Sequence, residues 1–199
     1  MKKFLLYIVL TLCLVLTAGC KTKNRELTVE DVKNSTILVK NDGTVQAATI
    51  ETFDKNNYSL DELKAFITKE IGKYNQDNEA DSIVINTLEV KDKNAVLILN
   101  YKSLENYTAF NKVKASFTTT ADAKSSKLEL PDVYVNVKDG AYTSPDVALK
   151  NSKYKVLVLN EKTDVIVDGK VKFFANGTLH GKSNFETGSA EPSVIIYKP

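Results

Sequence analysis

The chain is poor in the residues that most metal and nucleophilic sites require. Its 199 residues include two cysteines, no tryptophan and a single histidine, His180. Zinc sites need several Cys or His ligands, and nucleophilic triads need an imidazole beside a Ser or Cys. His180 lies in GTLHGK, where we predict a turn and no partner for the imidazole. We therefore predict no catalytic residue, no cofactor site and no metal site.

Signals for binding phosphates or calcium are also missing. The chain contains neither GxGxxG nor GxxxxGK[ST], and Arg25 is its only arginine, so the bidentate guanidinium fork is almost absent. Acids alternate in QDNEADS, at Asp77, Glu79 and Asp81. Counted from Asp77, however, the sixth and twelfth positions of a calcium loop are Ser and Leu instead of Gly and Glu. We interpret QDNEADS as a solvated acidic loop.

The N-terminus, in contrast, carries a clear signal. Lys2 and Lys3 precede an uncharged, mostly apolar run from Phe4 to Ala18, and small residues follow. At ~1.5 Å per residue this run spans only about 22 Å, less than the ~30 Å hydrocarbon core of a bilayer. The order basic, apolar, small is typical of secretory signals. We predict a signal peptide over residues 1–19.

The signal ends in LTAGC, which resembles the lipobox of bacterial lipoproteins. It departs from that pattern in having Leu16 at −4 and Thr17 at −3. The resemblance implies that Cys20 carries a diacylglyceryl group, and two acyl chains hold a protein stably on a bilayer. It also implies a cell-membrane protein, lipid-anchored on the extracytoplasmic face, with the bilayer as its partner at Cys20. The alternatives are an uncleaved signal anchor and a secreted protein with an unmodified cysteine.

Loss of the signal changes the composition of the mature chain. Cys13 leaves with the signal and Cys20 takes the lipid, so no thiol remains for a disulfide. Removing residues 1–19 takes away Lys2 and Lys3 and no acid, so the 27 basic residues fall to 25, equal to the 25 acidic ones. A chain without basic surplus is not expected to bind nucleic acid. Its stability must come from a hydrophobic core.

We expect residues 20–35 to be the lipidated cysteine and a tether, followed by an α+β domain over 36–120. Ser59-Leu60-Asp61-Glu62 is a capping box that starts an amphipathic helix. Its apolar stripe, which we expect in the core, consists of Leu60, Leu63, Ile67, Ile71 and Tyr74, with Phe66 beside it. Strands expected at 36–39, 45–53, 82–91 and 94–101, and a second helix from Ser103, complete the order β-β-α-β-β-α with an antiparallel sheet.

The second half of the chain predicts mostly β-structure. Polar residues 121–127 are expected to form a loop or boundary. Strands expected at 133–137, 154–159, 164–167, 171–174 and 193–197 are separated by turn signals such as Asp168-Gly169. This pattern favours a β-rich domain or sub-domain over 128–199, as a meander or small sandwich. The chain as a whole is predicted to be α+β.

Segments of the mature chain resemble uncharacterised lipoproteins of Clostridia-type Gram-positive bacteria. The resemblance rests on NYKSLENYTAFN, YKVLVLNEKTDVIVDGKV and the terminal VIIYK. It implies a lipoprotein and assigns no active site. The tyrosines at 107, 134, 142, 154 and 197 are interpreted as half-buried sheet aromatics with a hydroxyl in water, in preference to a stacking platform.

We therefore expect a membrane-anchored extracytoplasmic lipoprotein that is a non-catalytic binding or envelope-organising module. Its partner would be an envelope protein or polymer. The alternatives are a carboxylate- or lysine-based enzyme acting on cell-envelope material, and an accessory subunit of an envelope complex. A binding module predicts an exposed apolar patch or an open sheet edge. An enzyme predicts a closed cleft in which acids converge.

Overall fold

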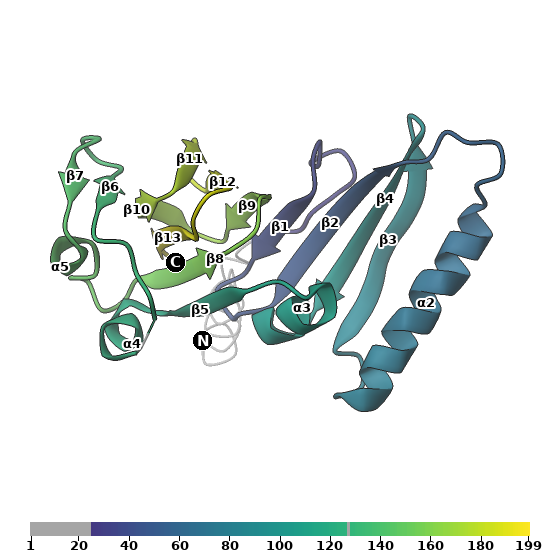
Figure 1. Cartoon of the computed structure of the whole chain (residues 1–199), viewed down its shortest axis with the longest axis horizontal. Helices are drawn as coiled ribbons and strands as arrows, with labels where there is room; N and C mark the ends of the chain where they lie inside the picture. Colours follow the sequence, from purple (N-terminus) through teal and green to yellow (C-terminus); the bar gives the residue numbers. More distant parts are fainter. Residues whose placement is uncertain (1–24, 127) are drawn as a thin grey trace, which may run out of the picture.

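The computed structural model describes residues 25–126 and 128–199, so the predicted signal peptide and Cys20 lie outside the described residues. The protein is α+β and rich in strands, as predicted, and it forms two sheets (Figure 1). The first sheet has the order β11 (Gly177–His180), β12 (Asn184–Thr187), β9 (Asp164–Val167), β1 (Thr36–Val39), β2 (Val45–Thr52), β4 (Asn94–Tyr101) and β3 (Ile83–Lys91).

The second sheet has the order β5 (Ala115–Thr119), β8 (Lys155–Leu159), β13 (Ser193–Lys198), β10 (Lys170–Ala175), β6 (Tyr134–Asn136) and β7 (Tyr142–Thr143). Each sheet thus contains strands from both sides of residues 121–127, where we expected a boundary. One hydrophobic cluster joins the inner faces of the two sheets, and it includes Ile37, Val165 and Ile195. Alternation along each strand supplies these residues, since every second side chain faces inward.

The helices are α2 (Leu60–Asp77), α3 (Leu104–Asn111), α4 (Thr120–Ser125) and α5 (Pro145–Ala148). The caps predicted from sequence are present at two of them. The backbone N–H of Glu62 donates to Ser59 Oγ at 3.3 Å, and that of Asn106 donates to Ser103 Oγ at 3.3 Å. These bonds satisfy N–H groups that the first turn of a helix leaves without partners.

The antiparallel sheet predicted for residues 36–120 is only partly observed. The order β1-β2-α2-β3-β4-α3 is present, but β1 also pairs in parallel with β9, with Ile37 opposite Val165. The loop prediction for 121–127 is wrong over most of its length, because α4 occupies Thr120–Ser125. Thr119 caps this helix by accepting the Asp122 N–H at 3.1 Å, and the buried Ala123 fixes it to the second sheet.

The outer face of the first sheet is covered by residues 25–35, which we expected to be part of a tether. Leu27 and Val32 are buried there against β1, β2, β4 and β9. The backbone N–H of Leu27 donates to Gln46 Oε1 at 2.8 Å. The Arg25 guanidinium donates to Ser183 Oγ at 2.8 Å and to Asn184 Oδ1 at 3.1 Å. The described part of the predicted tether is therefore packed on the domain. Among the described helices, none combines the length and apolar character needed to cross a membrane.

Candidate functional site: an open apolar groove beside helix α2

An open groove of about 640 Å³ lies between the N-terminal half of α2 and the inner face of the first sheet. Its floor is formed by β2, β3 and β4 and its wall by the helix. Apolar side chains dominate both surfaces: Leu88, Ala95 and Leu97 from the strands, and Leu63, Phe66 and Ile67 from α2. A pocket of this volume falls in the range of ligand-binding clefts in proteins.

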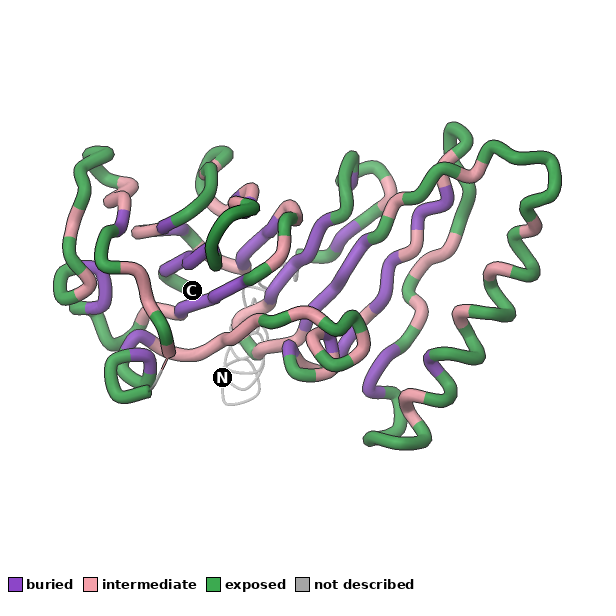
Figure 2. The backbone as a smooth tube through the Cα atoms, viewed as in Figure 1, coloured by how far each residue is buried: buried purple, intermediate pink, exposed green. Residues whose placement is uncertain are grey.

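The groove exists because α2 packs on the sheet with only part of its length. Ile71 is the one buried residue of the helix in the described structure, and Figure 2 shows most of the helix exposed. Phe66 is 62% exposed and Leu60 is 36% exposed. The prediction that the whole apolar stripe lies in the core is therefore wrong for Leu60 and Phe66. In contrast, Leu63 is half-buried and Ile67 packs against the main hydrophobic cluster. The second sheet and α3 cover other parts of this face, and nothing in the described chain covers the rest.

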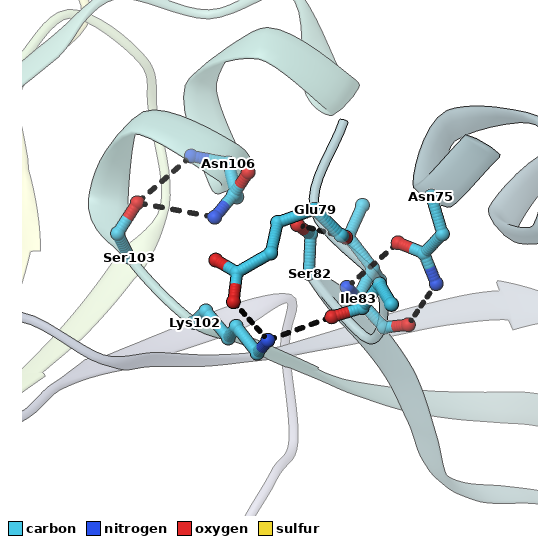
Figure 3. A network of polar contacts seen from close by, with 8 residues as sticks. Asn75, Glu79, Ser82, Ile83, Lys102, Ser103 and Asn106 are labelled. Carbon is cyan, nitrogen blue, oxygen red and sulfur yellow. Dashed lines mark hydrogen bonds and ion pairs between the residues drawn. The ribbon is translucent and has the colours of Figure 1, made fainter. Parts of the chain in front are cut away.

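The C-terminal end of α2, in contrast, is firmly attached to β3 (Figure 3). The Asn75 side chain donates to the Ile83 carbonyl oxygen at 2.9 Å and accepts the Ile83 N–H at 3.1 Å. The side-chain amide thereby pairs with the edge strand as a neighbouring strand would. Tyr74 adds a hydrogen bond from its hydroxyl to Asn106 Oδ1 at 3.1 Å and packs edge-on against Phe110. These contacts fix one end of the groove wall.

The rim of the groove is formed by the segment between β2 and α2. The Phe53 and Tyr58 rings pack with centroids 5.1 Å apart, and Tyr58 is 40% exposed. Glu51 at the end of β2 and Glu62 in the first turn of α2 also line the groove. The site therefore combines an apolar floor and wall with two exposed carboxylates. It can bind and desolvate an apolar group, and it places negative charge beside it.

His180 does not lie in a turn, as we predicted, but at the end of β11. Cross-strand pairing with β12 extends the strand to this residue, and His180 Nε2 lies 3.4 Å from Glu186 Oε2. Asp164 is opposite Glu186 in the sheet and accepts a hydrogen bond from Asn34 at 3.0 Å. These groups line a polar pocket of about 540 Å³ on the outer face of the first sheet. The sheet thus gives His180 a carboxylate neighbour that the sequence did not reveal.

The segment QDNEADS, which we interpreted as a loop, begins in the last turn of α2 with Gln76 and Asp77 and continues as the connection to β3. The Glu79 carboxylate accepts a hydrogen bond from Lys102 Nζ at 2.9 Å (Figure 3). The Lys102 ammonium also donates to the Ala80 carbonyl oxygen at 2.6 Å. Within residues 25–126 and 128–199, no group of three His, Cys, Asp or Glu side chains could hold a metal ion.

The five tyrosines have different environments. The interpretation that all of them are half-buried is wrong for every one except Tyr154. The Tyr107 hydroxyl, on α3, donates to Glu161 Oε1 at 2.7 Å. Tyr134 and Tyr197 are completely buried, and their hydroxyls have no hydrogen-bond partner in the described chain. Burial raises the pKa of Tyr134 to about 12. Tyr142 is 80% exposed and Tyr154 is half-buried, and the five do not meet at one surface.

Comparison of the chain with protein-family models, with curated proteins and with solved structures gives no match. The groove residues were missed because helical periodicity shows which side chains share a face and not whether that face is covered. Phe66 was the residue that could have indicated the groove. It makes the apolar face of α2 wider than the area that packs against the sheet.

Proposed function

We propose that the protein is a lipid-anchored extracytoplasmic binding module whose ligand occupies the groove beside α2. The observation that carries this proposal is the exposure of Phe66, at 62%, next to an apolar floor on the same face of the sheet. Contiguous exposed apolar surface is uncommon on soluble domains and marks sites of interaction. An occupant would remove this surface from water, which supports binding at ~25 cal/mol per Å² of apolar area.

The lining of the groove favours binding over catalysis. Its polar side chains are hydroxyls, an amide and the carboxylates of Glu51 and Glu62, which lie on different elements and are both exposed. General acid–base catalysis needs a group held against the reacting atom, with a pKa near the working pH. The carboxyl whose pKa is raised by burial is that of Glu161, and it lies outside this groove, bonded to Tyr107.

Binding at the groove is tested by photo-crosslinking in cells from a reactive residue at position 66. We expect a discrete crosslinked product that disappears when Leu63→Asp is added. Val133→Asp is the matched control, because Val133 is 53% exposed and does not line the groove. Identification of the product also decides between an independent module and an accessory subunit of an envelope complex. Equal crosslinking in both aspartate variants would contradict the proposal.

Anchoring is tested separately by metabolic labelling with a fatty-acid analogue. We expect the wild-type chain to be labelled and Cys20→Ala to be unlabelled and released from the membrane fraction. The motivation is the LTAGC stretch at residues 16–20. Equal labelling of the two proteins would exclude lipidation at Cys20.

The polar pocket at β9, β11 and β12 supports a second candidate, an enzyme acting on cell-envelope material. His180 beside Glu186, with Asp164 on the neighbouring strand, provides a base and two carboxylates on one face. Purified protein is incubated with cell-wall material, and release of soluble fragments is measured for wild type and Glu186→Gln. Turnover that Glu186→Gln abolishes would support the enzyme, while absence of turnover leaves the groove as the functional site.

A further inference from the structure

We propose that the occupant of the groove is a basic amphipathic segment of a partner polypeptide. This inference rests on the proposed function, because it names the chemistry of the ligand at the same groove. Three observations carry it: the distribution of charge around the groove, the form of its apolar surface, and the attachment of its wall at one end.

The charge around the groove is negative. Glu51 and Glu62 are the charged side chains among its lining residues in the described chain, and both are exposed to solvent. Glu51 comes from the end of β2 and Glu62 from the first turn of α2, so both elements carry a carboxylate at the groove. Lys55 Nζ lies 5.6 Å from the Tyr58 ring centroid, but Lys55 does not line the groove. A cationic ligand is therefore favoured over an anionic one.

The apolar surface combines one turn of the helix with the strands beneath it. Leu63, Phe66 and Ile67 lie at i, i+3 and i+4 on one turn of α2, and Leu88 and Leu97 line the groove from the strands. An amphipathic helix binds apolar grooves between a helix and a sheet through anchors at i, i+3, i+4 and i+7. Its polar flanks would then lie at the rim, where lysine or arginine can reach Glu51 and Glu62. This geometry selects an apolar and basic polypeptide segment.

Helix α2, which forms the wall of the groove, is fixed by side-chain hydrogen bonds at its C-terminal end and has none to the sheet in its first half, among the described residues. Asn75 and Tyr74 fix the C-terminal end through Ile83 and Asn106. A groove open at its rim accepts a segment that enters sideways. This favours part of a larger chain over a small molecule that must be enclosed.

The test uses the mature chain with Cys20→Ser, which retains every described residue, and two synthetic peptides of equal length. One peptide is an amphipathic Leu/Lys helix and the other its Leu/Glu counterpart, each with one tryptophan. The protein contains no tryptophan, so emission from the peptide reports binding directly. We expect the Leu/Lys peptide to bind about tenfold or more tightly than the Leu/Glu peptide, with a preference that salt reduces.

Reversing the charge of the two groove glutamates distinguishes a charge effect from a loss of folding, because an unfolded variant would lose binding to both peptides. The double variant Glu51→Lys, Glu62→Lys is expected to reverse the preference toward the Leu/Glu peptide. The matched control is Glu70→Lys, Glu89→Lys, which changes two exposed acids outside the groove and should leave the preference unchanged. Circular dichroism confirms that each variant is folded.

The outcomes separate this inference from the proposed function. If both peptides bind equally and Phe66→Asp weakens both, the groove remains the binding site and the basic ligand is excluded. If neither peptide binds, or if the control reverses the preference as the groove variant does, the inference is wrong. In that case the cell crosslinking at position 66 still decides whether the groove binds anything.

Discussion

At the scale of single residues, the burial of the Glu161 carboxyl beside Tyr107 sets a specific pH dependence. Burial raises the pKa of the Glu161 carboxyl above its ordinary value of 4.5, although the hydrogen bond from Tyr107 opposes the shift. The folded state therefore binds this proton more tightly than the unfolded state. The contribution of Glu161 to stability is greatest below pH 4.5 and is lost as the pH rises through the folded pKa.

We predict that Glu161→Gln removes this loss. Gln keeps an acceptor for the Tyr107 hydroxyl and carries no charge. The free energy of unfolding of the wild type minus that of the variant should decrease as the pH rises from 4.5 through the folded pKa of Glu161 and should be constant above it. Urea denaturation at several pH values measures it. A difference that stays constant, or that increases with pH, would contradict the assignment.

Other residues show which site features a sequence can reveal. The apolar face of α2 was predicted correctly as a set of side chains, yet its exposure was not, because exposure depends on what the second sheet and α3 leave uncovered. His180 was placed in a turn because the pairing of β11 with β12 is a contact between strands that sequence patterns do not specify. Helix and strand periodicity is local, whereas both corrections depend on packing between distant segments.

At the scale of elements, helix N-cap residues and the apolar–polar patterns of helices and strands predicted most of the first half of the chain. The strands β1 to β4 and the helices α2 and α3 lie within a few residues of the expected ranges. Helix α4 was missed although Thr119-Thr120-Ala121-Asp122 begins it in the sequence pattern of a cap, because the small polar residues after it resemble a loop. Strands β5, β7, β11 and β12 were missed, since short strands are defined by their partners, whereas β6 lies within the strand expected at 133–137.

We predict that Asn75→Ala loosens α2 from β3 with the rest of the fold retained. The variant removes two hydrogen bonds with Ile83, each worth about 1 kcal/mol, so the free energy of unfolding should fall by about 1–2 kcal/mol. Amide hydrogen exchange at Ile83 should accelerate more than exchange at Ile98 in the buried strand β4. Gln76→Ala is the control on the exposed side of the helix and should change neither quantity. An unchanged exchange rate at Ile83 would show that Asn75 does not hold the helix.

At the scale of the whole molecule, the two sheets connect the two halves of the chain. Strand β1 lies between β2 and β9, and the cluster between the sheets draws on both sides of residues 121–127. We predict that the halves unfold together. Tryptophan reporters in Phe110→Trp and Phe173→Trp should show the same urea midpoint, and a chain ending at residue 120 should not fold. Two separate midpoints would instead support independent domains at 36–120 and 128–199.

The packing of residues 25–35 limits where the protein can act. Arg25 is bonded to β12 through Asn184 and to neighbouring Ser183, so the chain is fixed to the domain about five residues after Cys20. Fully extended, that interval spans no more than about 18 Å. If Cys20 is anchored as proposed, the domain stays close to the bilayer surface and reaches only the adjacent part of the envelope. Its ligands must come to the membrane surface, because the protein cannot search the cell wall for them.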